Sequence, residues 1–130
     1  MLVVIDTNIL VSAMWSRNGA PARVVSMIIS GELIPCYDYR MLAEYREVLK
    51  RPKFQFSDGE INSLLEWIID NGHSVIARSL DTIFTDKDDK KFYEVAKFCG
   101  ARLITGNKKH FPDEEFILTA SEFIQQCDLK

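Results

Sequence analysis

Short apolar runs alternate with longer amphipathic segments along the chain, and this alternation restricts the possible folds more than any other feature. The runs lie at 2–5, 33–36, 74–77, 102–105 and 116–118. Runs of this length and composition are typical of strands that are buried on both faces. Because the segments between them have helical periodicity, the sequence predicts an α/β fold with a parallel sheet that helices cover on both faces.

Residues that commonly begin or end helices bound the predicted helices. One helix is expected over 39–49 and another over 88–99, and a closing helix is expected after 119. The signals are a proline at a helix start, glycines at helix ends and two pairs with capping-box spacing: Pro21, Gly31, Gly72, Gly100, Ser57 with Glu60, and Thr119 with Glu122.

The composition predicts one soluble domain that covers 1–130. Apolar residues make up 47% of the chain, enough for a single core, and the net charge of −3 provides no overall attraction to nucleic acid. Cys36, Cys99 and Cys127 are odd in number and far apart, so reduced thiols in a cytoplasmic protein are expected rather than disulfides or a zinc site. The run at 2–5 is too short to cross a membrane.

Polar residues directly follow several predicted strands. Asp6 ends the first run, Asp38 follows the second closely, and Asn107 follows the strand at 102–105. Ligands of parallel sheets bind outside the carboxyl ends of the strands, so these side chains are expected at a binding edge. Thr7 and Asn8 add a hydroxyl and an amide beside the first carboxylate. An alternative is that Asp6 only caps the helix that follows it.

Helix phase separates Glu44 from Glu47 within the helix at 39–49. Glu44 lies at the edge of the apolar stripe, whereas Glu47 points away from it. A carboxylate beside the core requires a cation or hydrogen bonds, since an unpaired buried charge is costly. The alternatives are that Glu44 reaches solvent or pairs with Arg40.

The densest acidic signal is the run Asp86-Lys87-Asp88-Asp89-Lys90-Lys91. A solvated helix N-terminus, favoured by the helix dipole, explains it without further function. Three aspartates within four positions also repel one another, and a bound cation would relieve that repulsion. Together with the other acids they suit Mg²⁺ or Mn²⁺ and the hydrolysis of phosphodiesters. This chemistry requires no histidine base, and neither His73 nor His110 is expected in the site.

Local basic groups are the candidates for substrate contacts. Arg46, Lys50 and Lys108 are the residues we predict to bind substrate, and a solvated surface is the alternative for each.

Four segments resemble the PIN-domain family, especially the toxin ribonucleases of toxin–antitoxin pairs (the VapC type). They are 3–13, 42–52, 86–92 and 100–107, which carry the early Asp-Thr-Asn, the helical glutamate, the aspartate run and a late Thr-Gly-Asn. The resemblance implies a three-layer α/β/α fold with an acidic pocket at the carboxyl edge of its parallel sheet.

The resemblance also assigns the candidate catalytic residues. The first family acid falls on Asp6, the second on Glu44 and the third in the pair Asp88-Asp89, with Asp89 favoured because of its spacing to the glycine at the helix end. The fourth falls on Asn107, where an amide replaces a charge and leaves the number of ions open. Asp6, Glu44 and Asp89 are therefore the predicted metal ligands.

The resemblance further implies supporting roles for Thr7, Asn8 and Thr105, an RNA substrate, a homodimer and an antitoxin protein as partner. A dimer surface is expected near the helix after Ser57, which is more apolar than one stripe requires, although core burial also explains that composition.

Other classes fit the motifs less well. A haloacid-dehalogenase-type phosphatase needs a second acid where this chain has Asn8, and a receiver domain needs an early acid pair that is missing. A non-catalytic PIN-like RNA-binding module is the main alternative, because of Asn107.

Overall fold

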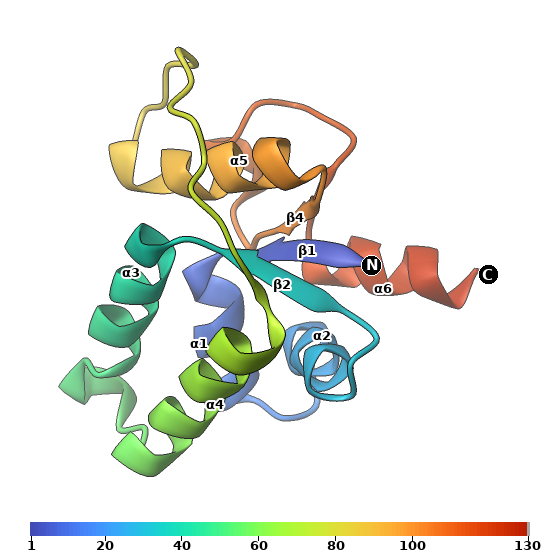
Figure 1. The fold of residues 1–130 in the computed structure, drawn as a ribbon. Helices are drawn as coiled ribbons and strands as arrows, with labels where there is room; N and C mark the ends of the chain where they lie inside the picture. The colour runs from blue at the N-terminus through green and yellow to red at the C-terminus, as the bar shows by residue number, and fades with distance from the viewer. Residues whose placement is uncertain (130) are drawn as a thin grey trace.

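A sheet of five parallel strands forms the centre of the protein, whose computed structural model describes residues 1–129 (Figure 1). The strand order is β3-β2-β1-β4-β5, and each neighbouring pair is parallel. The bounds are β1 Leu2–Ile5, β2 Ile34–Tyr37, β3 His73–Ser74, β4 Arg102–Ile104 and β5 Ile117–Leu118.

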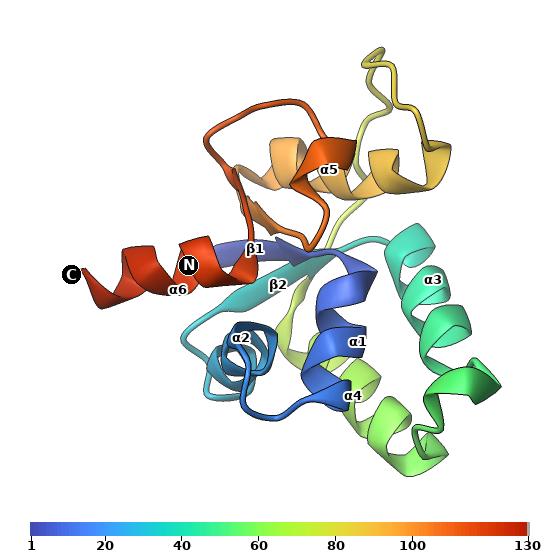
Figure 2. The ribbon, with the colours of Figure 1, turned by 180° about the vertical axis from the view of Figure 1, so that it is seen from behind.

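Helices cover both faces of the sheet, which makes three layers (Figures 1 and 2). In Figure 1, α1, α2 and α4 lie below the sheet and α5 lies above it, while α6 packs beside α2. The helices are α1 Thr7–Trp15, α2 Ala20–Ile29, α3 Tyr39–Leu49, α4 Asp58–Asn71, α5 Lys87–Cys99 and α6 Ala120–Asp128. The predicted α/β/α class with a central parallel sheet is confirmed.

The helix ends follow the local signals of the sequence. Thr119 and Glu122 form a complete capping box at α6, and the Ser57 side chain accepts a hydrogen bond from the Glu60 amide at α4. Gly31 and Gly100 take φ values of 87° and 63°, a left-handed conformation in which a side chain is strained. Helices α2 and α5 therefore end where a glycine allows the chain to turn.

The predicted strand at 74–77 is wrong in its extent. Within residues 1–129, β3 pairs only with β2, through Cys36–His73 and Tyr37–Ser74, and the backbone amide of Val75 donates the last hydrogen bond to the Tyr37 carbonyl, at 2.9 Å. β2 ends at Tyr37 because α3 begins two residues later, so the following residues have no strand to pair with. They start the long connection to α5 instead.

The core lies on both faces of the central strand. Val3, Val4 and Ile5 of β1 are almost completely buried, as are Phe92 of α5 above and Leu10 of α1 below. No helix within residues 1–129 is long and apolar enough to cross a membrane.

The strand order makes the carboxyl end of β1 a point where neighbouring connections diverge. The chain leaving β1 reaches β2 on one side, and β4 lies on the other. In parallel sheets such a point opens a crevice for ligands. Ile5 pairs with Ile104, so the residues that follow β1 and β4, Asp6 and Thr105, meet at this crevice.

Candidate active site

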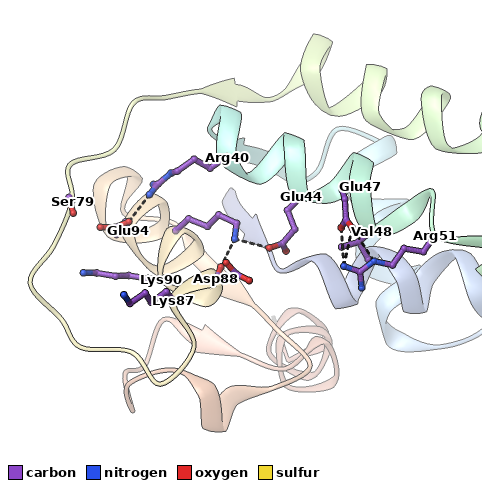
Figure 3. A pocket seen from close by; sticks show the side chains of 11 residues that line it. Arg40, Glu44, Glu47, Val48, Arg51, Ser79, Lys87, Asp88, Lys90 and Glu94 are labelled. Carbon is purple, nitrogen blue, oxygen red and sulfur yellow. Dashed lines mark hydrogen bonds and ion pairs between the residues drawn. The ribbon is translucent and has the colours of Figure 1, made fainter.

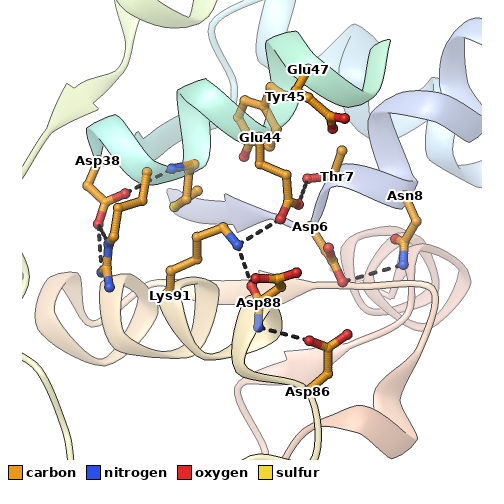
Figure 4. Close-up of polar contacts among 12 residues, drawn as sticks. Asp6, Thr7, Asn8, Asp38, Glu44, Tyr45, Glu47, Asp86, Asp88 and Lys91 are labelled. Atoms are coloured by element: carbon orange, nitrogen blue, oxygen red, sulfur yellow. Dashed lines mark hydrogen bonds and ion pairs between the residues drawn. The ribbon is translucent and has the colours of Figure 1, made fainter. Parts of the chain in front are cut away.

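Asp6 is a buried carboxylate at the end of β1, with only 5% of its surface exposed. Thr105 Oγ1 donates to Asp6 Oδ2 at 2.7 Å. Asn8 Nδ2 lies 3.4 Å from the same oxygen (Figure 4). Asp6 stands at the N-cap of α1, yet among the described residues its side chain accepts no capping hydrogen bond. The interpretation as a helix cap is therefore wrong, and the carboxylate is held from β4.

Asn8 joins the end of β4 to the start of α1. Its Oδ1 accepts a hydrogen bond from the Gly106 amide at 3.0 Å, and the Asn107 amide donates to Thr105 Oγ1, also at 3.0 Å. A Cβ at Gly106 would lie 3.3 Å from Asn8 Oδ1, so glycine permits this close approach. The turn after β4 thus fixes the two side chains that hold Asp6.

Glu44 points from α3 toward the same crevice, as its helix phase predicts. Its side chain is 23% exposed, whereas that of Glu47 is 63% exposed. Thr7 Oγ1 donates to Glu44 Oε2, and Lys91 Nζ lies 2.7 Å from Glu44 Oε1 (Figure 4). The alternative pairing with Arg40 is wrong, because Arg40 pairs with two other acids.

Those two acids are Asp38 and Glu94, both 2% exposed. Arg40 lies 2.7 Å from Asp38 Oδ2 and 2.9 Å from Glu94 Oε1. The other Glu94 oxygen accepts from the Leu80 amide at 2.7 Å and so ties the β3–α5 connection to α5. Burial alone would raise the pKa of Glu94, but the Leu80 amide and the Arg40 guanidinium outweigh it and lower the pKa. Asp38, expected at the binding edge, caps α3 by accepting from the Met41 amide.

The acidic run at the start of α5 divides into three different environments. Asp86 caps the helix by accepting from the Asp88 amide at 2.9 Å, and Asp88 is exposed. The Asp89 side chain is only 16% exposed, and its buried Oδ2 makes no hydrogen bond within residues 1–129. Of the three aspartates, Asp89 is the one directed toward the interior.

His110 stands beside Asp89, so the expectation that no histidine lies in the site is wrong. Its Nδ1 is 3.3 Å from Asp89 Oδ2, within ion-pair distance but without the geometry of a hydrogen bond. The 3₁₀ turn η2 (Lys108–His110) brings it there, with the His110 amide donating to the Asn107 carbonyl. The available sequence signal was the short spacing between His110 and the predicted strand at 102–105, which keeps this histidine near the carboxyl edge of the sheet.

Two of the three inward carboxylates, Asp6 and Asp89, have raised pKa values. Burial raises the pKa of Asp6 to about 6, the Thr105 hydrogen bond opposes this shift, and the charges of Asp89 and Glu44 add to it. Burial also raises the pKa of Asp89, with contributions from Asp86 and Glu44, while His110 opposes the rise. Acids from β1, α3 and α5 therefore share one negative region.

This donor set fits a hard divalent cation. Carboxylate oxygens are the ligands such ions prefer, the Asp89 Oδ2 atom is buried without a hydrogen-bond partner among the described residues, and a cation would relieve the mutual repulsion. In the present side-chain positions, no three His, Cys, Asp or Glu residues of the described chain are arranged to hold one ion together. Thr7 donates to one oxygen of Glu44 and Lys91 pairs with the other, so a metal ion that binds Glu44 must compete with the Lys91 ammonium.

The remaining predicted residues lie around this centre. Asn107 is exposed and shares a separate hollow with Asn8. Arg46 and Lys50 are exposed at the end of α3, and Lys108 pairs with Glu122 at 3.1 Å. The structure thus brings Asp6, Glu44 and Asp89 together with their supports and leaves the predicted substrate contacts at the periphery.

A polar hollow runs between α3 and α5 next to the acids (Figure 3). Its lining mixes acidic and basic side chains: Arg40, Glu44, Glu47, Val48, Arg51, Ser79, Lys87, Asp88, Lys90, Lys91 and Glu94. Most of its basic residues come from the acidic run itself, where lysines alternate with the aspartates. That alternation was the available signal, because it places cations on the same helix start as the acids.

An α/β/α fold with carboxylates gathered at the carboxyl end of its central strand has the type of acidic crevice that suits hard divalent cations. The model of the PIN domain family matches residues 2–109, and the chain belongs to this family. Proteins of this family are typically nucleases and generally use divalent metals.

An uncharacterized protein of Methanocaldococcus jannaschii is 30% identical over 109 residues, which cover 82% of this chain and 70% of that protein. No solved structure matches the chain significantly.

Proposed function

We propose that this protein is a metal-dependent endoribonuclease that hydrolyses RNA phosphodiesters with Mg²⁺ or Mn²⁺. The observation that carries the proposal is the convergence of Asp6, Glu44 and Asp89 from three elements, close enough for the other two charges to raise the pKa of Asp6. Such convergence of acids destabilises the fold on its own and is useful when a cation is bound.

Asp6, Asp89 and Glu44 would hold the metal, which supplies an activated water and neutralises charge on the leaving oxygen. Thr105 and Asn8 orient Asp6 through their hydrogen bonds to its Oδ2, and Thr7 orients Glu44. Residues that hydrogen-bond to metal ligands keep them in one orientation, and substituting them commonly weakens metal affinity or activity.

Asp88 and Asn107 complete the proposed catalytic set from the edge of the site. Asp88 lines the hollow between α3 and α5, and the backbone N–H of Asn107 donates to the Thr105 hydroxyl that holds Asp6. We assign both to the orientation of water or substrate rather than to direct metal binding.

The substrate would run along the hollow between α3 and α5. Lys87 and Lys90 line it, and the predicted contacts Arg46, Lys50 and Lys108 lie outside it on exposed or half-exposed surface. Because the net charge is −3, binding of a phosphate backbone depends on such local cations and weakens as salt rises.

Cleavage of an end-labelled, unstructured RNA by the purified chain tests the proposal. Cleavage is expected with Mg²⁺ or Mn²⁺, is expected to stop with EDTA, and is expected to be lost in Asp6→Asn. Asp38→Asn is the matched control, since Asp38 is also buried but pairs with Arg40. Undiminished cleavage in EDTA or by Asp6→Asn would falsify the proposal.

The Lys91–Glu44 pair favours a second candidate, a non-catalytic PIN-like RNA-binding module, because one acid is already neutralised by a lysine. Such a module retains RNA on a filter in EDTA and cuts none with either metal. Cleavage that depends on metal and on Asp6 rejects this candidate.

We further propose the setting that the resemblance suggests: a single domain over 1–130 that acts in the cytoplasm as the toxin of a toxin–antitoxin pair and is blocked by a small antitoxin protein. Growth arrest on expression, relieved by the product of an adjacent gene, tests this setting. Growth at the normal rate with active enzyme present contradicts it.

We also propose a homodimer that uses the outer side of α4. Ile61, Leu65 and Ile68 are buried in the core, which accounts for much of the apolar character of α4, while Trp67 and Ile69 are 38% and 40% exposed. Sedimentation at micromolar concentration should show a mass twice 14.9 kDa, and a species of 14.9 kDa alone contradicts the dimer.

A further inference from the structure

Lys91 is a largely buried cation within the acidic site. Its side chain is only 12% exposed, and its Nζ lies 2.7 Å from Glu44 Oε1 and donates to the backbone carbonyl of Asp88 (Figure 4). The same Nζ lies 5.0 Å from the centre of the Phe92 ring. These contacts hold the ammonium at one place, between the start of α5 and the middle of α3.

Glu44 differs from the other two inward acids in the partners that contact its carboxylate oxygens. Thr7 donates to one oxygen and the Lys91 ammonium pairs with the other, so a metal ion at Glu44 must compete with a positive charge of the protein itself. Asp89, in contrast, keeps its Oδ2 without a hydrogen bond within residues 1–129. Asp6 accepts hydrogen bonds from the neutral side chains of Thr105 and Asn8, so within residues 1–129 Glu44 is the one of the three acids that pairs with a lysine.

We propose that Lys91 is an internal counter-cation that holds Glu44 back from the metal, so that an incoming divalent ion must break the Lys91–Glu44 pair. The inference rests on the proposed metal-dependent function and deepens it. Lys91 is a positioning residue: it sets the affinity for metal by competing for Glu44. Its charge also lowers the repulsion among the acids when no ion is bound.

The physical basis is the strength of a charge pair removed from water. The attraction between two charges at this distance grows as the surroundings become less polar. A buried Glu44 carboxylate that has lost Lys91 therefore interacts strongly with any cation that replaces the lysine. If Lys91 is removed, Glu44 keeps its charge and its bond to Thr7 but gains a free oxygen. The metal can then bind the third carboxylate without first displacing an ammonium.

Titration calorimetry of Mn²⁺ into the full-length, RNA-free protein measures this competition directly. Lys91→Met should raise the Mn²⁺ affinity about tenfold or more, the range that close charge pairs reach in coupling measurements. Lys91→Arg keeps a cation and should leave the affinity near that of the original protein. Lys90→Met is the matched control: it removes the same charge from the neighbouring position, where the lysine makes no ion pair within residues 1–129, and should change affinity by less than about threefold.

A double-substitution cycle separates competition from a general change in charge. Glu44→Gln should lower Mn²⁺ affinity by less than about threefold when Lys91 is present, and by about tenfold or more in the Lys91→Met background. The two substitutions are thus expected to be strongly coupled. Additive effects, equal gains in Lys91→Met and Lys90→Met, or no detectable Mn²⁺ binding in any variant overturn the inference.

RNA cleavage measured on the same proteins keeps the two proposals apart. Strong coupling between Lys91 and Glu44 without cleavage by any variant supports the inference and rejects the nuclease. Metal-dependent cleavage with additive Mn²⁺ affinities supports the nuclease and rejects the role of Lys91.

Discussion

Neutralising Asp6 should stabilise the metal-free protein at neutral and higher pH, although it removes the central acid of the site. Burial and the neighbouring acids raise its pKa from 3.8 to about 6. The folded protein therefore holds this proton more tightly than the unfolded chain. Below pH 4 the group is protonated in both states and costs no stability, and as pH rises from about 4 to 6 the folded state loses stability.

The full loss of folding stability caused by the Asp6 charge is reached above pH 6. Two pKa units at about 1.4 kcal/mol each correspond to roughly 3 kcal/mol. The side chain that Asp6→Asn introduces carries no charge at any pH, but Thr105 cannot satisfy its amide as well as it satisfies the carboxylate. We therefore expect a gain of about 1–3 kcal/mol at pH 8, which is roughly 3–10 °C in Tm for a chain of this size, and little gain at pH 4.

Thermal unfolding in EDTA across pH 4 to 8 measures this effect. Asp38→Asn provides the matched control, because Asp38 is also buried but accepts from the Met41 amide and pairs with Arg40 at 2.7 Å. It should lose stability at pH 8, by about 1–3 kcal/mol. Mn²⁺ should then raise the Tm of the original protein more than that of Asp6→Asn.

Two results would refute the reasoning. A loss of stability in Asp6→Asn at pH 8 would mean that Asp6 is stabilised as an anion. A gain of the same size at pH 4 and pH 8 would mean that its charge is not responsible.

Three further predictions concern other residues of the site. Asp89→Asn should abolish RNA cleavage at moderate Mg²⁺ by weakening metal binding, whereas Asp88→Asn should only reduce it; a dead Asp88→Asn beside an active Asp89→Asn shows that the assignment is off by one residue. Asn107→Asp should raise Mn²⁺ affinity and lower metal-free stability, and titrations that cannot tell it from the original protein exclude Asn107 from the metal's surroundings. Glu94→Gln should release the β3–α5 connection and speed its proteolysis. Acid should do the same, because the pKa of Glu94 is lowered and the stability that its charge contributes is lost as pH falls through that pKa. Proteolysis of the connection at an unchanged rate contradicts this role.

The sequence was sufficient for features that depend on neighbours in the chain. Capping at Ser57 and Thr119 and the glycine stop at Gly100 depend on a few neighbouring residues, so local patterns predict them. Helix phase likewise predicted that Glu44 faces inward and Glu47 outward, since both directions refer to the same helix axis.

Only the tertiary structure decided which inward side chains meet. Thr105 and Asp6 are 99 positions apart, and their hydrogen bond follows from the pairing of β1 with β4. Periodicity gives the direction of a side chain around its own element, but not the distance or rotation of the element it will face. For this reason the sequence alone offered solvent or Arg40 as the surroundings of Glu44 and missed Lys91, and it also missed His110 beside Asp89. The packing of α3 and α5 on the central sheet fixed those partners.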